Sequence, residues 1–391
     1  MKETNTNLAN SKVVVIGGSY AGTLATWARL KYPHIVDIAY ASSAPLRDVA
    51  DFYEYMEVVG DQIGLQSQEC VKTISEAFSQ LERKLETAEG IEEMSDRFSM
   101  CKTIRTDEPY RSHFLNYVSR TFPDPVQYGT AYHIQFYCQK FLNFTGSSLD
   151  KLISLNNVSH ITQNMTSALL LDHDYFGSIF DELISNDDVI YIRCVEDYDQ
   201  FIEEMGNSEN NSTARMWIYQ ICTEFGWFQT LTSKNQPFGN NVDLQYFNHL
   251  CTDIYGQAFN KEMLDNAIYR TNLLYGSTKL EITKLISVHG TQDPWHPVGL
   301  LHDLNPLAPT IVINGTHHCA DLHPVQPDSP PQLREAQKTV QKFISEVKLK
   351  KRCKNSYLSG FSDSTYPECT PPPQLREAQK TVQKFISEWL Q

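Results

Sequence analysis

Four short apolar runs constrain the fold more strongly than any other feature of this sequence. They read KVVVI, IVDIAY, KLISVHG and PTIVING, at residues 12–16, 35–40, 284–290 and 309–315. Continuous apolar runs of this length are typical of strands that are buried on both faces, as in a parallel sheet. A helical pattern with a Trp and several Leu and Ala residues separates the first two runs. The sequence therefore predicts an α/β fold.

The chain between the second and third runs has a different texture. Amphipathic helical patterns dominate residues 47–213, and strand signals there are scarce. We expect a helical insertion at 47–213 between two parts of one sheet, 8–46 and 214–346. Residues 347–391 then form a linker and a terminal helix.

The C-terminal part holds an exact repeat. PQLREAQKTVQKFISE occurs at 331–346 and again at 373–388. Each copy has the pattern of an amphipathic helix, and only one copy can occupy a given docking groove. We interpret the repeat as a duplicated exon or an assembly error, because solenoid repeats are more numerous and more divergent.

The first run leads into VVVIGGSYAG, residues 13–22. A serine at a sharp strand-to-helix turn needs small neighbours, which Gly17, Ala21 and Gly22 supply. The helix that follows directs its N-terminus, and the N–H of Tyr20, toward an anion formed at Ser19. A Gly-rich phosphate turn and a purely structural turn are the alternatives for this motif.

The ends of the third and fourth runs supply the other groups that a serine nucleophile needs. GTQDPWHP places Asp293 after one strand, and INGTHHCAD places His317 and His318 after the next. The chain order Ser, Asp, His is that of the α/β-hydrolases, in which a base activates the serine and a carboxylate orients the base. A turn former before Pro294 and ordinary loop polarity are the structural alternatives.

These motifs resemble the S28 serine peptidases. The resemblance rests on GGSYAG with the following helix and KYPH, on SSAP, on WIYQICTEFG (217–226), and on the DPW and HC loops. It covers residues 8–346 and is closest to the thymus-specific protease branch. It implies an α/β-hydrolase lobe with an inserted helical cap, and cleavage of short peptides near a chain end, often beside proline.

The resemblance also assigns roles. It implies Ser19 as nucleophile, Asp293 as orienting acid and His318 as base, with an oxyanion donor at Tyr20. His318 is chosen over His317 because it precedes Cys319, as in the HC pair of related members; His317 then lines the pocket. Glu224 either meets a substrate amine or forms a structural salt bridge. No cofactor and no metal are expected.

One part of the family pattern is missing. Family members place several strands before the nucleophile strand, and a loop after one of them supplies a second oxyanion donor. We therefore expect an incomplete hydrolase sheet from a truncated gene model, with the KVVVI strand exposed at an edge. A non-catalytic peptide-binding product and an esterase on the same fold remain alternative functions.

Composition limits the partners. A formal net charge of -14 argues against nucleic-acid binding, and no apolar run is long enough to cross a membrane. Short peptides are the expected partners, and a homodimer is left open. Nine cysteines indicate disulfides and an oxidising compartment, so we expect a lysosomal, endosomal or secreted protein although no signal peptide is visible. Asn-x-Ser/Thr sites add to this expectation and lie at Asn143, Asn157, Asn164, Asn210, Asn211 and Asn314.

Overall fold

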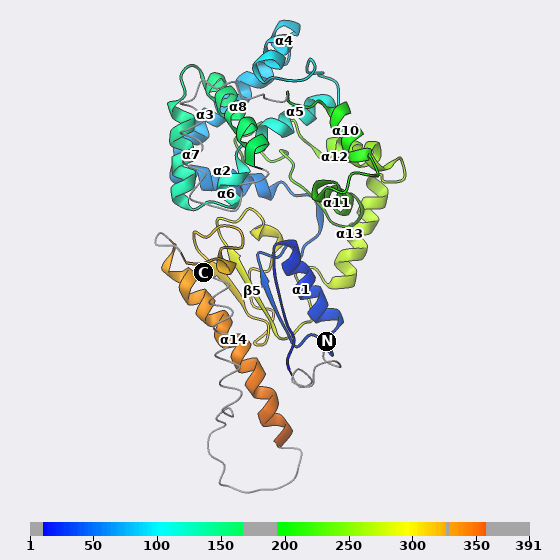
Figure 1. Ribbon diagram of the computed structural model, residues 1–391, viewed down its shortest axis with the longest axis vertical. Helices are drawn as coiled ribbons and strands as arrows, with labels where there is room; N and C mark the ends of the chain where they lie inside the picture. The colour runs from blue at the N-terminus through cyan, green and yellow to red at the C-terminus, as the bar shows by residue number, and fades with distance from the viewer. Residues whose placement is uncertain (1–10, 167–193, 326–328, 357–391) are drawn as a thin grey trace. The chain divides into compact units, whose positions relative to one another are not determined.

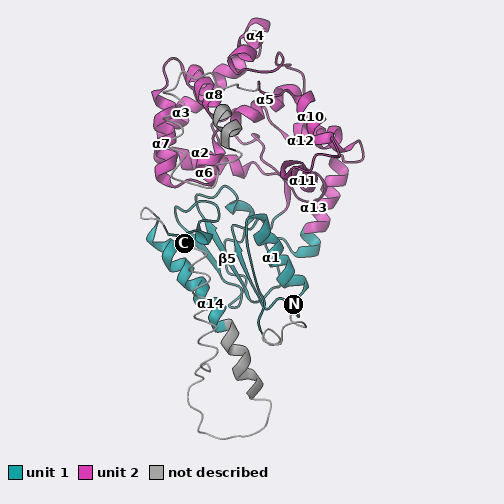
Figure 2. Cartoon of the chain, viewed as in Figure 1, with its two compact units in different colours: residues 1–47, 272–391 teal, residues 48–271 magenta. Residues whose placement is uncertain are grey.

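The computed structural model describes residues 11–166, 194–325 and 329–356. The chain divides into two compact units, which Figure 2 shows in different colours. Unit 1 comprises Met1–Arg47 and Asn272–Gln391, and unit 2 comprises Asp48–Thr271.

Unit 1 is built on a four-stranded parallel sheet with the strand order β1-β2-β5-β6. All four apolar runs of the sequence form its strands, so the prediction of an α/β fold with a parallel sheet is confirmed. Among the described residues β1 pairs only with β2, and the edge strand leaves Ile16 42% exposed. The strands are β1 (Val14–Gly18), β2 (Ile38–Ser42), β5 (Leu285–Gly290) and β6 (Thr310–Ile313).

Two helices, α1 (Tyr20–Lys31) and α14 (Pro331–Ser356), lie on opposite sides of this sheet (Figure 1). One face of α14 packs against the sheet through Leu333, Ala336, Val340 and Ile344, together with Ile38, Tyr40, Ile286, Val288 and Ile313 of the strands. The first copy of the repeat therefore forms the docked part of α14. The second copy lies outside the described residues. Two short 3-10 helices complete the unit: η3 (His296–Val298) and η4 (Ala320–Leu322).

Unit 2 is mainly helical. Its core includes a cluster of rings in which Phe122 contacts Phe78, Phe141 and Phe238 at centroid distances of 5.3–6.4 Å. Its helices are α2 (Glu54–Gln66), α3 (Gln68–Lys84), α4 (Ala88–Arg97), α5 (Tyr110–Ser119), α6 (Pro123–Gln127), α7 (Ala131–Asn143), α8 (Ser148–Thr166), α10 (Tyr198–Gly206), α11 (Thr213–Gln220), the π-helix η2 (Ile221–Phe225), α12 (Leu244–Tyr255) and α13 (Lys261–Tyr275). The last residues of α13, from Asn272, are counted in unit 1.

The two short strands of unit 2, β3 (Val49–Asp51) and β4 (Gly226–Phe228), pair in parallel. The pairing of β3 with β4, the packing of α12 on α10 and the Cys222–Cys251 disulfide all connect the chain after residue 213 with unit 2. Residues 214–271, which we expected in the second part of the sheet lobe, thus belong to the helical unit. The first boundary, 47/48, lies one residue from the expected one.

Three disulfides join residues of unit 2: Cys70–Cys138, Cys101–Cys194 and Cys222–Cys251. The expectation of disulfides is confirmed. Cys319 is a free cysteine.

Candidate active site

Ser19 occupies the turn between β1 and α1. Its φ of 55° lies in the left-handed region, which is rare for a residue with a side chain. The backbone N–H of Ser19 donates to the Ser42 carbonyl oxygen at 2.9 Å, and its own carbonyl accepts from the Gly22 N–H at 2.9 Å. The turn is therefore held from both sides, with the serine at the apex where strand changes to helix.

Two glycines allow this turn. A Cβ on Gly17 would lie 2.1 Å from the Ala21 carbonyl oxygen, and one on Gly22 would lie 2.9 Å from the Gly17 oxygen. Real side chains cannot come that close to backbone atoms. Ala21, in contrast, is exposed. We expected its small size to matter for the close packing of strand and helix, but Gly22 makes that contact.

Asp293 and His318 meet at the ends of the adjacent strands β5 and β6. The Nδ1 atom of His318 lies 2.9 Å from both carboxylate oxygens of Asp293. The backbone N–H of Trp295 donates to Asp293 Oδ1 at 2.9 Å, which fixes the orientation of the carboxylate. Both side chains are almost fully buried, at 0% and 4% exposure for Asp293 and His318.

Of the two adjacent histidines, His318 is the one that contacts the carboxylate. The Nδ1 atom of His317 lies 3.1 Å from the carbonyl oxygen of His318. A third histidine, His289 on β5, is also buried, and its two ring nitrogens have no hydrogen-bond partner among the described residues. Burial lowers the pKa of His289 to about 4, so this ring is neutral.

Asp293 and His318 shift each other's pKa in opposite directions. Burial by itself would lower the pKa of His318, but the Asp293 charge and hydrogen bond outweigh that effect and raise it. Burial would raise the pKa of Asp293, yet the His318 charge and several hydrogen bonds hold it below its usual value. The imidazolium form of His318 is therefore stabilised by the carboxylate beside it.

The turn that holds Ser19 and the loop that holds His318 touch each other. A Cβ on Gly18 would lie 2.9 Å from Cys319 Sγ and 3.6 Å from Cys319 Cβ. Gly18 and Cys319 are the chain neighbours of Ser19 and His318 respectively. The tertiary structure thus places the turn that holds Ser19 against the loop that holds His318.

Two serines at the end of β2 connect these loops, and sequence reasoning gave them no role. Ser42 Oγ donates to Asp321 Oδ1 at 2.6 Å, and Ser43 Oγ accepts from the Cys319 N–H at 2.9 Å. Tyr40 also donates to Asp321. Burial raises the pKa of the Asp321 carboxyl, although these hydrogen bonds oppose the rise. The sequence contained a sign of this role. The SSAP segment begins at the carboxyl end of β2, which lies at the same edge of the sheet as the carboxyl ends of β1 and β5.

The other candidate residues have different surroundings. Tyr20 is the first residue of α1, so its N–H belongs to the helix turn whose donors point out of the helix end. Glu224 is exposed on the π-helix η2 of unit 2, and no cation lies at ion-pair distance from it among the described residues. Burial and the charge of Glu224 raise the pKa of Asp48 to about 8.

The acceptor asparagines differ in accessibility. Asn143, Asn211 and Asn314 are exposed. Asn157 is half-buried and donates from Nδ2 to the Arg97 carbonyl oxygen at 3.1 Å, and Asn210 donates to the Glu204 carbonyl oxygen at 3.1 Å. The side chain of Asn164 lies outside the described residues. Glycosylation at all six positions stays a prediction.

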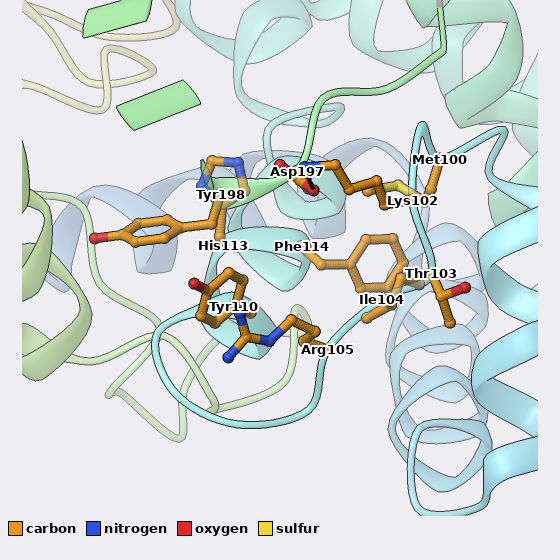
Figure 3. Close-up of a pocket in the computed structure, with 10 residues that line it drawn as sticks. All are labelled: Met100, Lys102, Thr103, Ile104, Arg105, Tyr110, His113, Phe114, Asp197 and Tyr198. Atoms are coloured by element: carbon orange, nitrogen blue, oxygen red, sulfur yellow. Dashed lines mark ion pairs between the residues drawn. The ribbon is translucent and has the colours of Figure 1, made fainter. Parts of the chain in front are cut away.

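Figure 3 shows a cavity of unit 2. Its volume is about 20 Å³, which holds roughly one water molecule and not a peptide. Lys102 and Asp197 in its wall pair at 2.9 Å, and the Arg105 guanidinium lies over the Tyr110 ring. We therefore do not regard it as a substrate site.

No helix of the described residues combines the length and apolar character of a membrane span.

Comparison with known proteins identifies the family of this chain. Residues 1–340 match the family model described as serine carboxypeptidase S28. A Caenorhabditis elegans chain named as a serine protease is 32% identical over 338 residues, which are 81% of this chain and 60% of that relative. Mouse thymus-specific serine protease is 28% identical over 352 residues, covering 86% of this chain and 64% of the relative.

Human lysosomal Pro-X carboxypeptidase is more distant. It is 24% identical over 336 residues, which are 81% of this chain and 60% of the relative. The chain thus spans about three fifths of the length of the curated relatives it matches.

Proposed function

Because the chain belongs to the serine carboxypeptidase S28 family, we propose that it is a serine peptidase that works through an acyl-enzyme on Ser19. The observation that carries this proposal is the contact of His318 Nδ1 with both Asp293 oxygens at 2.9 Å, beside the Ser19 turn. This is the arrangement in which a carboxylate fixes the tautomer of a histidine and leaves Nε2 to act as the base.

The proposed reaction has two halves. His318 takes the Ser19 proton as Oγ forms a bond to the substrate carbonyl carbon, and the N–H of Tyr20 stabilises the oxyanion. The carbon–nitrogen bond then breaks, and His318 returns the proton to the leaving amine. Water attacks the remaining ester with His318 again as base, which releases the acid and regenerates Ser19.

The substrate class follows from the family. The name of the human relative describes cleavage at a Pro-X bond, so we propose short peptides, cleaved near a chain end by dipeptidyl-peptidase or Pro-X carboxypeptidase action. Glu224 is proposed to meet a substrate amine and His317 to line the pocket. We infer that unit 1 is an α/β-hydrolase sheet and that the helices of 47–213 form its cap.

The location is proposed from redox chemistry. Three disulfides form and persist in the secretory route and not in the cytosol. A lysosomal, endosomal or secreted protein fits this chemistry, as does the name of the lysosomal relative.

A fluorophosphonate probe tests the proposed nucleophile. We expect the wild-type chain to be labelled and Ser19→Ala to lose the label. Ser287→Ala is the matched control, because this buried serine has a hydroxyl without a hydrogen-bond partner among the described residues. Labelling that survives in Ser19→Ala, or no labelling of a folded wild-type chain, would contradict the proposal.

The substrate proposal needs its own measurement. Peptides with proline at the second position from the N-terminus and peptides that end in Pro-Xaa are compared with a short acyl ester. Faster cleavage of either peptide class supports an exopeptidase. Turnover of the ester alone would favour an esterase on the same fold.

A further inference from the structure

The loop that carries His318 is anchored by a buried acid, Asp321. This residue is 5% exposed and lies in η4, three residues after the proposed base. Ser42 Oγ donates to one of its carboxylate oxygens at 2.6 Å, and the Tyr40 hydroxyl donates to the other. Both donors belong to β2, so the carboxylate joins the histidine loop to this strand.

The strand end that holds Asp321 also holds the turn with Ser19. The carbonyl oxygen of Ser42 accepts the N–H of Ser19 at 2.9 Å, while the hydroxyl of Ser42 donates to Asp321. One residue of β2 therefore contacts the proposed nucleophile through its backbone and the histidine loop through its side chain. A shift of Asp321 relative to Ser42 would change the separation between the Ser19 turn and the His318 loop.

The backbone between His318 and Asp321 turns sharply. Cys319 has a φ of 57°, in the left-handed region that a residue with a Cβ adopts only at a cost. Its N–H donates to Ser43 Oγ at 2.9 Å, which holds the near side of the turn. On the far side, Gln337 of α14 donates from Nε2 to the Asp321 carbonyl oxygen at 3.1 Å. The side chain of Asp321 adds the contacts that fix this far side on β2.

A carboxyl group is costly at this buried place. Burial raises the pKa of both the Asp321 carboxyl and the Tyr40 hydroxyl, so the tyrosine keeps its proton and can donate it. An apolar side chain would avoid the cost of burying a polar group. We propose that Asp321 is a positioning residue of the active site: its two hydrogen bonds to β2 set the place of His318 relative to Ser19. This inference rests on the proposed function, in which His318 is the base.

The rate of fluorophosphonate labelling tests this placement, because the proposed reaction needs His318 to take the Ser19 proton. Asp321→Leu branches at the same carbon but has no polar atom, and we expect it to slow labelling about 100-fold, as a small misplacement does. Asp321→Asn should lose no more than about threefold, since an amide can bond both hydroxyls. Equal losses in the two variants, or a wild-type rate in folded Asp321→Leu, would overturn the inference.

Two milder variants decide the question if Asp321→Leu does not fold. Tyr40→Phe and Ser42→Ala each remove one donor, and each should slow labelling about three- to tenfold. Combined with Asp321→Leu, neither should slow it further, because both act through the same carboxylate. Ser287→Ala is the matched control, since its buried hydroxyl on β5 has no hydrogen-bond partner among the described residues. Wild-type rates in folded Tyr40→Phe and Ser42→Ala would contradict the proposal.

Proton NMR gives a readout that needs no reaction. The Nδ1 proton that His318 shares with Asp293 should give a downfield signal, assigned by its loss in His318→Gln. We expect this signal to move in Asp321→Leu and Tyr40→Phe and to stay in place in Asp321→Asn and Ser287→Ala. A merely structural role would lower stability in urea but leave the signal of the folded protein unmoved, which would contradict the inference. If folded wild type is not labelled, the proposed function fails, while the NMR signal still decides whether Asp321 positions His318.

Discussion

At the scale of single residues, the contact between His318 and Asp293 sets how the site responds to protons. The carboxylate raises the pKa of the imidazole above its usual value of about 6.5 despite burial. In the proposed mechanism His318 must be neutral to accept the Ser19 proton, so a raised pKa moves activity toward higher pH.

We therefore expect kcat/KM to rise with pH and to reach half its maximum above pH 6.5. At pH 5 at most a few per cent of His318 is neutral, so activity there should be lower by about 30-fold or more. A pH–rate profile measures this, and Asp293→Asn should move the residual acid limb to lower pH because the stabilising charge is gone. An optimum near pH 5 would contradict the prediction.

At the scale of elements, the turn from β1 into α1 depends on backbone packing. Gly17 and Gly22 leave no room for a Cβ, because the atoms in the way belong to the backbone and cannot rotate aside. The side chain of Ala21, two residues after Ser19, is exposed to solvent. The sequence motif alone does not distinguish these positions.

Gly17→Ala should abolish fluorophosphonate labelling and lower the free energy of unfolding by about 1–3 kcal/mol, since its Cβ would overlap the Ala21 carbonyl. The control is Ala21→Gly, which removes an exposed methyl group at a cost of about 1 kcal/mol or less and should retain labelling. Retained labelling in Gly17→Ala would mean that the turn is not held as described.

The repeated helix offers a matched experiment of its own. Leu333 is buried against the sheet, and Leu375 occupies the same position in the second copy. Leu333→Ala should lower the free energy of unfolding by about 2–5 kcal/mol, as expected for a core leucine. Leu375→Ala should leave it unchanged in urea unfolding if the first copy fills the groove. Little loss in either variant would show that the copies exchange, because the intact copy would then fill the groove.

At the scale of the whole molecule, the two units are stabilised differently. Unit 1 relies on the parallel sheet and its two helices, and its Cys319 is a free thiol. Unit 2 carries three disulfides between helices and loops that lie far apart in the sequence. Reduction should therefore act mainly on unit 2.

Replacing Cys222 and Cys251 together by serine should destabilise unit 2 by about 3–4 kcal/mol, the loop-entropy value for their separation of 29 residues. Calorimetry with and without reductant measures the loss. Cys319→Ser is the control, since this thiol is not in a disulfide and lies in unit 1. A loss below about 1 kcal/mol would show that the cross-link adds little.

The sequence by itself determined the parallel strands and the positions of Ser19, Asp293 and His318 at strand ends, because apolar runs and Gly turns are local signals. It also indicated disulfides and membership of a peptidase family. Only the tertiary structure decided that residues 214–271 join the helical unit and that Gly22 makes the close contact. It also decided that Ser42 and Ser43 connect the three loops. These features depend on which strands are neighbours and where side chains point, and packing between distant segments sets both.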